Sequence, residues 1–271
     1  MKTVSRIAAR FGALRREGRT GLIPFLTAGD PSLRFTEKAI HLLDRPETAA
    51  IEIGVPFSDP LADGPAIQRS SERALARGVT LVRVLDMVER LRPSVAAPLV
   101  LMSYMNPLLR LGLERFAARA ARAGVDAVIA TDLPAEESAE YGRILASHGI
   151  GTVFLAAPTS PPERIRRIAA ASTAFIYYVS LTGVTGARSA LPADLAARLG
   201  GVRKITKRPL AVGFGVSSAA EVRRLVGRCD AVVVGSALVR AVEGEKNDRD
   251  RLAALEKKVA ALTVPLGRRG R

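Results

Sequence analysis

The sequence is poor in the residues that build metal, redox or nucleophilic sites. Among its 271 residues there are one cysteine, Cys229, and only two histidines, His41 and His148. A single cysteine excludes an internal disulfide and favours a reducing, cytoplasmic environment. His41 falls on the polar side of a predicted helix, and His148 falls at a helix end, where a cation is favourable. The sequence therefore argues against a histidine-rich metal site and against a Ser-His-Asp triad.

Long apolar runs are also lacking. No run of apolar residues reaches the ~18 that a membrane span requires. The residues that follow Met1 predict an amphipathic, arginine-bearing helix and not the apolar core of a secretory signal. Hydrophobic residues nevertheless make up 48% of the chain, which is enough to build a sizeable core. We therefore expect a chain with no membrane partner.

Acidic residues are scarce beside basic ones. The chain holds 41 Lys and Arg against 26 Asp and Glu, which gives a formal net charge of +15. One interpretation is a nucleic-acid surface, and the other is an arginine-rich composition spread over solvated helix faces. The cations are dispersed through every predicted helix, and there is no RNA-binding aromatic motif or zinc-finger spacing. We therefore predict no nucleic-acid partner, although a positive field would attract a phosphorylated substrate.

Eight short apolar segments alternate with helical patterns. The predicted strands are 22–27, 51–53, 98–102, 127–130, 152–156, 175–179, 210–212 and 231–234. The predicted helices are 3–16, a helix before Asp44, helical sequence up to about Leu91, 112–123, 136–147, 162–171, about 192–205, 218–227 and a last helix that carries Leu252, Leu255, Val259 and Leu262. Strands that alternate with helices predict a parallel sheet. Eight such units in one chain predict a closed (β/α)8 TIM barrel, an α/β fold, with an extra N-terminal helix. No shift in composition marks a second domain, so we expect one barrel domain over 1–271.

The stretch from Ala50 to Gln68 holds the candidate catalytic residues. Glu52 lies between Ile51 and Ile53, and a carboxylate in a buried strand is unfavourable unless it is paired or used. Asp63 ends the loop that follows this strand. Because loops after the strands form the mouth of a barrel, we predict a catalytic pair there, with a raised pKa for Glu52 and an ionised Asp63. Turn formation in Asp-Gly-Pro is an equally open interpretation of Asp63.

Glycine-rich turns follow the last three strands, at 183–186, 213–215 and 235–236. Glycines let the backbone approach an anion, and barrel phosphate sites are usually built after the seventh and eighth strands. One such turn is as often structural, but the three together predict a phosphate site. Apolar or aromatic residues occupy the other mouth positions: Phe25, Met102, Tyr104, Ile129, Leu155, Tyr177 and Phe214. They suggest a substrate with an aromatic end and a phosphate end, whereas barrel core is the alternative, above all for Ile129 and Leu155. Asp132 is expected to cap or hold a loop, and Asp59 is ambiguous.

Several of these stretches resemble one known family along nearly the whole chain. They include E-I-G-V-P-F-S-D-P-L-A-D-G-P-A-I-Q (52–68), L-M-S-Y-M-N-P (101–107), F-I-Y-Y-V-S-L-T-G-V-T-G-A-R (175–188), G-F-G-V-S (213–217) and V-V-V-G-S-A-L-V (232–239). The chain resembles the α subunit of tryptophan synthase. The first stretch and the T-G-V-T-G-A motif are highly specific to that family, and their places after the predicted strands agree with the barrel.

The resemblance implies a carbon–carbon lyase of tryptophan biosynthesis. Indole-3-glycerol phosphate would split into indole and glyceraldehyde 3-phosphate by a retro-aldol reaction. Glu52 matches the acid/base glutamate, Asp63 the aspartate that stabilises the cation developing on the indole nitrogen, and Tyr177 a tyrosine near both. The phosphate residues implied are Gly186, Gly215, Gly235 and Ser236. The implied indole pocket comprises Phe25, Met102, Tyr104, Ile129, Leu155, Thr185 and Phe214.

The resemblance also implies a partner. The family's β subunit uses the indole with pyridoxal phosphate in an α-β-β-α assembly, and this chain would hold no cofactor and no metal. The implied contact residues are Pro56, Asp59, Asn106 and Pro107. Loops near 56–63 and 181–195 would close over the substrate.

The chain departs from the family pattern in a few places. Leu181 stands where an arginine is common, Thr131 and Met102 alter pocket positions, and the segment 44–48 replaces a shorter lead into the second strand. None of these departures touches the two acids. They leave open a stand-alone lyase that releases free indole. A non-catalytic activating subunit is a further alternative, against which the intact Glu52 and Asp63 argue.

Overall fold

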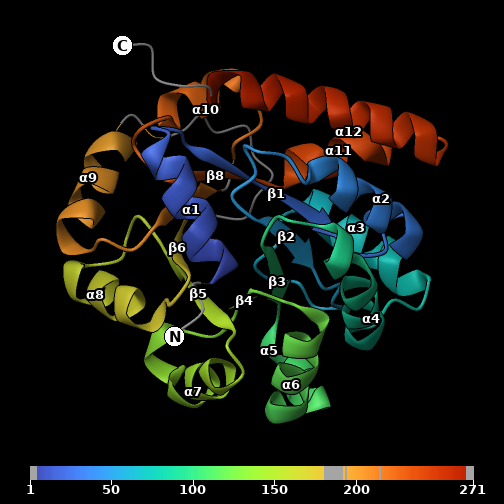
Figure 1. Cartoon of the computed structure of the whole chain (residues 1–271), viewed down its shortest axis with the longest axis horizontal. Helices are drawn as coiled ribbons and strands as arrows, with labels where there is room; N and C mark the ends of the chain where they lie inside the picture. Colours follow the sequence, from blue (N-terminus) through green and yellow to red (C-terminus); the bar gives the residue numbers. More distant parts are fainter. Residues whose placement is uncertain (1–4, 180–191, 193, 214, 267–271) are drawn as a thin grey trace.

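The computed structural model describes residues 5–179, 192, 194–213 and 215–266. Its strands close into a parallel barrel in which each pairs with the next along the chain and the last pairs with the first (Figure 1). The strands are β1 (Gly21–Thr27), β2 (Ile51–Gly54), β3 (Leu99–Ser103), β4 (Ala127–Ala130), β5 (Gly151–Ala156), β6 (Phe175–Val179), β7 (Leu210–Gly213) and β8 (Ala231–Val234). The predicted (β/α)8 fold is confirmed.

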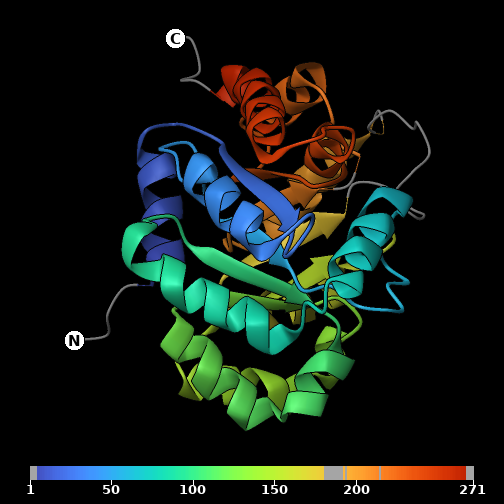
Figure 2. The ribbon, with the colours of Figure 1, turned by 90° about the vertical axis from the view of Figure 1, so that its right-hand side faces the viewer.

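Helices cover the outside of the barrel (Figure 2). The α-helices are α1 (Arg6–Arg16), α2 (Leu33–Leu43), α3 (Pro65–Ala76), α4 (Leu81–Leu91), α5 (Met105–Leu111), α6 (Leu113–Ala123), α7 (Ala139–Ser147), α8 (Pro162–Ala171), α9 (Leu195–Ile205), α10 (Ala219–Leu225), α11 (Ser236–Glu243) and α12 (Asp248–Thr263). Three 3₁₀ turns lie at Arg92–Ser94, Ala135–Glu137 and Val264–Leu266 among the described residues. Side-chain caps begin several helices, as at Ser32 of α2 and in the Ser218–Glu221 capping box of α10.

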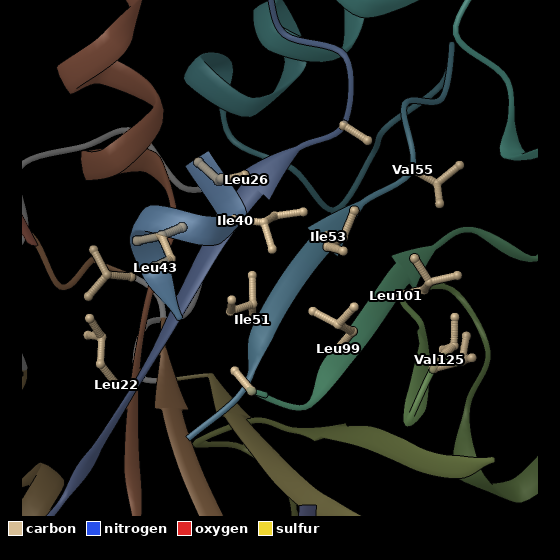
Figure 3. Packing of buried hydrophobic residues seen from close by; sticks show 14 of the residues in the cluster. Leu22, Leu26, Ile40, Leu43, Ile51, Ile53, Val55, Leu99, Leu101 and Val125 are labelled. Carbon is tan, nitrogen blue, oxygen red and sulfur yellow. The ribbon is translucent and has the colours of Figure 1, made fainter. Parts of the chain in front are cut away.

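The outer face of the sheet packs on the helices. Ile51 and Ile53 of β2 point to the same side as Leu99 and Leu101 of β3, toward the apolar face of α2 (Figure 3). Because side chains alternate along a strand, Glu52 points the other way, into the barrel. The alternation read from the sequence therefore sets the direction of the candidate acid.

The extra N-terminal helix closes the lower end of the barrel, which is the end opposite the loops that follow the strands. Ile7, Phe11 and Leu14 of α1 are buried against inward-facing strand residues, and the rings of Phe11 and Phe175 lie 5.7 Å apart. Arg6 of the same helix forms a 3.0 Å ion pair with Asp126. Since α1 fills this end, the mouth formed by the loops after the strands is the end at which a substrate can enter.

The helix boundaries differ from the sequence prediction in several places. The predicted helix 112–123 is preceded by a separate helix, α5, and Gly112 lies between the two with φ of +87°. The Tyr104–Pro107 turn is thus the beginning of a helix, since proline is tolerated in a first turn. The predicted helix 136–147 starts at Ala139 behind a 3₁₀ turn, and the one near 192–205 starts at Leu195.

The end of the chain differs as well. The helix predicted to run to 227 ends at Leu225, and α11 forms directly after β8 as a helix separate from the terminal one. Leu255, Val259 and Leu262 of α12 are buried in the main core, so this stripe packs against the body as predicted (Figure 2). No helix in the described part of the chain is long and apolar enough to cross a membrane.

Candidate active site

Glu52 is buried inside the barrel near its mouth. The residue is 1% exposed, and its Oε1 has no hydrogen-bond partner among the described residues. Burial raises the pKa of Glu52 to about 8, and the nearby charge of Asp63 acts in the same direction. The carboxyl group is therefore mainly protonated at neutral pH, which agrees with the predicted acid role.

Asp63 lies in the loop that enters α3, one residue before the helix N-cap Gly64. The residue is 6% exposed, and the Tyr104 hydroxyl donates a 3.2 Å hydrogen bond to its Oδ2. Burial raises the pKa of Asp63 to about 6, against the lowering effect of the Tyr104 bond. Asp63 is thus still ionised at neutral pH as predicted, although it is buried and its loop does not leave it in solvent.

The turn interpretation of Asp63 also holds. Its peptide N–H donates to the Pro60 carbonyl at 3.0 Å, and its own carbonyl accepts a 2.9 Å bond from the Gln68 side chain. These backbone bonds hold the end of the loop while leaving the carboxylate oxygens for other partners. The same residue therefore makes the turn and presents the second acid.

Tyr177 of β6 lies with these two acids. It is buried among the inward-facing residues, and burial with the negative fields of Glu52 and Asp63 raises its pKa well above the usual value. The phenol is thus a protonated neighbour of both carboxyl groups. Gly213 of β7 makes room for it, because a Cβ at that position would lie 2.5 Å from the Tyr177 hydroxyl. The sequence placed Gly213 only in a phosphate turn, and nothing in its local pattern indicates this second role.

Phe25 forms a wall between the acids and the last strand. It lies opposite Glu52 in the β1–β2 register and is buried. A Cβ at Gly54 would lie 2.5 Å from the Phe25 ring, and one at Gly235 would lie 3.3 Å from it. The ring thus spans from the end of β2 to the start of α11. Met102 is partly buried and packs against the cluster that Phe25 forms with Ala66 and Val239.

The other predicted pocket residues differ in their positions. Tyr104 is buried, stacks on Phe57 at 5.0 Å, and bonds to the loop that carries Asp63. Ile129 is 1% exposed among inward-facing strand residues, as the barrel-core alternative expects. Leu155 is only partly buried and lies opposite Tyr177 in the register. Thr185 and Phe214 lie outside the described residues.

Two of the candidate phosphate residues lie at the start of α11. Gly235 is the N-cap of this helix and Ser236 is its first residue, both partly exposed at the mouth. Because a glycine cap brings no side-chain acceptor, the first N–H groups of α11 are suited to an anion. Gly215 is exposed with φ of +83°, a conformation that favours glycine. Gly186 lies outside the described residues.

The residues predicted to meet a partner lie on two neighbouring segments. Pro56 is buried, Asp59 and Asn106 are exposed, and Pro107 is partly exposed. Leu61 and Leu109, on the same loop and on α5, expose 86% and 54% of their surface, which the sequence did not single out. Asp132 accepts a 2.8 Å bond from the Met105 N–H and so caps α5, as expected.

The described residues contain no group of three or more His, Cys, Asp or Glu side chains that could hold a metal ion. The mouth of this barrel instead brings together two buried carboxyl groups, a buried phenol, an aromatic wall and the start of a helix. Acid/base groups beside an apolar wall and an anion-binding helix end are typical of a barrel enzyme that acts on a small phosphorylated substrate.

Comparison with known proteins defines the family. The family model described as tryptophan synthase alpha chain matches residues 11–264. A tryptophan synthase alpha chain from Geobacter sulfurreducens is 50% identical over 89% of this chain and 91% of the relative. A crystal structure of the alpha subunit from Legionella pneumophila superposes with a TM-score of 0.89 at 33% identity, over 97% of this chain and 99% of that chain. A chain from the tryptophan synthase a2b2 complex of Pyrococcus furiosus has a TM-score of 0.84 at 42% identity, over 90% and 98%. The chain belongs to the tryptophan synthase alpha chain family, whose members are lyases of tryptophan biosynthesis.

Proposed function

We propose that this chain cleaves indole-3-glycerol phosphate to indole and glyceraldehyde 3-phosphate. The observation that carries the proposal is the buried pair of acids with opposite protonation states at neutral pH. Glu52, with a pKa of about 8, keeps its proton, whereas Asp63, with a pKa of about 6, holds a negative charge. A retro-aldol cleavage needs one proton donor and one anion at the same site.

The two acids divide the work of the reaction. Glu52 donates its proton to C3 of the indole ring, and the positive charge that develops on the ring nitrogen is stabilised by the Asp63 carboxylate. The Glu52 carboxylate then accepts the proton of the hydroxyl group on the carbon attached to C3. The bond between C3 and that carbon breaks, its electron pair returns to the indole ring, and the aldehyde leaves. Glu52 is protonated again at the end.

The rest of the mouth would bind the substrate. The start of α11, with Gly235 and Ser236, together with Gly215, holds the phosphate. Gly186, the fourth proposed phosphate residue, lies outside the described residues. Phe25, Met102, Tyr104 and Leu155 line the indole ring, and Ile129 belongs to the core beneath them. Thr185 and Phe214, also proposed for this pocket, lie outside the described residues. Tyr177 stays protonated beside the acids and packs against the reacting part of the substrate.

The experiment is the initial rate of glyceraldehyde 3-phosphate release by the purified chain, with Glu52→Gln as its control. We expect the substitution to lower the rate by about 10²-fold or more, the usual contribution of a general acid/base group. A variant as active as the parent chain overturns the assignment of Glu52. A high rate without any partner supports the stand-alone lyase instead, and a slow rate that a β subunit accelerates supports the subunit role.

The proposed partner is a tryptophan synthase β subunit in an α-β-β-α assembly. Pro56, Asp59, Asn106 and Pro107, with the exposed Leu61 and Leu109, are the proposed contacts, because exposed apolar side chains gain most from being covered. Pyridoxal phosphate is expected in the β subunit and no cofactor in this chain, which would work as one barrel domain in the cytoplasm. Leu109→Asp should weaken β binding in a titration by sedimentation, whereas an exposed charge change away from this face, Arg166→Asp on α8, should not.

A further inference from the structure

The loop between β7 and α10 carries Gly215, one of the proposed phosphate residues. Oε2 of Glu221, in the first turn of α10, accepts the peptide N–H groups of Ser217 and Ser218 at 2.7 and 2.9 Å. The same oxygen accepts their two hydroxyl groups at 3.2 and 3.0 Å. The N–H groups of Gly215 and Val216 make no hydrogen bond to another described residue. The loop therefore has two successive N–H groups that are open to an anion.

Lys258 of α12 holds the same loop from another side. Its Nζ donates a 2.8 Å hydrogen bond to the Ser217 carbonyl oxygen. The Lys258 residue is partly buried, whereas the neighbouring Lys257 is exposed. A hydrogen bond from a charged donor is stronger than one between neutral groups. Ser217 is thus fixed at its N–H and hydroxyl by Glu221 and at its carbonyl by Lys258.

The charge of Lys258 also affects an anion bound at this loop. Against the raising effect of burial, the bonds from Ser217 and Ser218 hold the pKa of Glu221 below its usual value. Glu221 is therefore a carboxylate at neutral pH, beside a loop that is proposed to bind a phosphate. Lys258 bonds to the same residue, Ser217, and brings the opposite charge. Because like charges repel, a Glu221 carboxylate without this cation would weaken phosphate binding.

The helix that carries Lys258 supports both elements of the proposed phosphate site. α12 packs against α11, whose start holds Gly235 and Ser236, and against α10 (Figure 1). Its Leu255 and Val259 are buried in the main core. Lys258 directly precedes Val259 in the chain, so this buried stripe holds the lysine backbone while the side chain reaches the loop.

We propose that Lys258 is a positioning residue for the phosphate site. It fixes the Ser217 carbonyl, which keeps the open N–H groups of Gly215 and Val216 in place. It also offsets the negative charge of Glu221. The inference rests on the proposed function, in which this loop and the start of α11 bind the phosphate of the substrate. Lys258 acts through Ser217 and has no part in the proton transfers.

The test compares Lys258→Met, which removes the charged donor, with Lys258→Arg, which keeps one. Lys257→Met is the matched control, because it removes the same charge from the exposed neighbouring position of α12. The probe is glycerol 3-phosphate, a phosphate ester without the indole ring, and its Kd is measured with the full chain by isothermal titration calorimetry. Lys258→Met should raise this Kd by about fivefold, the effect of losing one hydrogen bond, and the other two variants should stay within about twofold of the parent chain.

Two further measurements separate a role at the phosphate from a general structural role. In Lys258→Met, the KM for indole-3-glycerol phosphate should rise by about the same factor as the Kd, while kcat should change by less than about twofold, because neither acid is touched. The Kd for indole, which has no phosphate, should be the same in the parent chain and in all three variants.

Several results would overturn the inference. They are an unchanged Kd for glycerol 3-phosphate in Lys258→Met, an equal rise in Lys257→Met, and a matching loss of indole binding or of kcat in Lys258→Met. A parent chain that does not bind glycerol 3-phosphate overturns it as well. A parent chain that binds this probe but does not cleave indole-3-glycerol phosphate overturns the proposed reaction alone, since the Kd of the probe still reports on Lys258.

Discussion

Burial sets the protonation state of the candidate acids, residue by residue. Oε1 of Glu52 has no hydrogen-bond partner among the described residues, so no bond to that oxygen offsets the loss of water around the charged form. Asp63 is nearly as buried, but it accepts the Tyr104 hydrogen bond. Burial raises the pKa of both carboxyl groups; the charge of Asp63 raises that of Glu52 further, whereas the Tyr104 bond lowers that of Asp63.

The first prediction at this scale concerns pH. Asp63 must be ionised and Glu52 protonated, so kcat/KM should rise through a pKa of about 6, reach a maximum near neutral pH and fall through about 8. The substrate phosphate also titrates in this range, with a second pKa of about 6. The Asp63→Asn variant distinguishes the titration of Asp63 from that of the phosphate. If kcat/KM of this variant still falls at low pH, the fall is due to the phosphate.

The second prediction concerns stability. The folded chain holds the Glu52 proton with a pKa of about 8, whereas the free side chain has a pKa of 4.5. The unfolded chain thus releases this proton at a lower pH than the folded chain does, which destabilises the folded state. This destabilisation is absent below the lower pKa, grows as pH rises, and is complete above the higher pKa. Relative to the parent chain, Glu52→Gln should gain about 3 kcal/mol more at pH 8 than at pH 5, as an upper estimate from this linkage.

Urea denaturation at the two pH values measures this difference, and any fixed effect of the buried amide cancels between them. Glu137→Gln, in the 3₁₀ turn before α7, is the matched exposed control and should show no such dependence. If the difference in unfolding free energy between Glu52→Gln and the parent chain is the same at both pH values, folding does not raise the pKa of Glu52.

Two helices that carry the site are joined at their far ends. Arg73 of α3 forms a two-pronged bond to Asp30, at 2.8 and 2.7 Å, and also contacts Glu243, the last residue of α11, at 2.9 Å. The start of α3 follows Asp63, and the start of α11 holds the candidate phosphate residues. The ion pairs of Arg73 and Glu243 therefore link α3, which follows Asp63, to α11, which carries the candidate phosphate residues.

We predict that Asp30→Asn lowers the free energy of unfolding by about 1 kcal/mol. Bonds from charged donors to a buried carboxylate contribute more than neutral ones, but Arg73 keeps 36% of its side chain exposed, so solvent screens part of the gain. Chemical denaturation measures the change. Glu37→Gln, which breaks the more exposed Arg90 pair, is the control and should change stability by less. A larger loss in the control than in Asp30→Asn would contradict this ranking.

At the scale of the whole molecule, the N-terminal helix decides which end of the barrel is open. Phe11 is 4% exposed and packs against Phe175 inside the lower end. We predict that Phe11→Ala lowers the free energy of unfolding by about 3 kcal/mol or more, because a large buried ring is lost and a cavity remains. Urea denaturation tests this, with Arg16→Ala, an exposed position in the last turn of the same helix, as the control that should change stability far less. An equal effect of the two substitutions would indicate that α1 does not fill the barrel.

The fold and the central acid could be predicted from local patterns. Eight apolar segments that alternate with helical ones require a parallel sheet, and the two isoleucines beside Glu52 place its side chain on the opposite face. Helix boundaries were less predictable, because α5 and α11 are short helices that begin soon after strands. So few residues do not show the helical period clearly enough to separate these helices from their neighbours in the sequence.

The local sequence patterns of this protein determine the order of its strands and helices, the barrel, and the burial of Glu52. Which distant residues meet depends instead on the assembled fold. Tyr104 reaches Asp63 across 41 positions of the chain, and the Gly54 backbone leaves room for the Phe25 ring. Periodicity is a property of neighbours along the chain, whereas these contacts depend on strand register and on closure of the barrel, which no single segment contains.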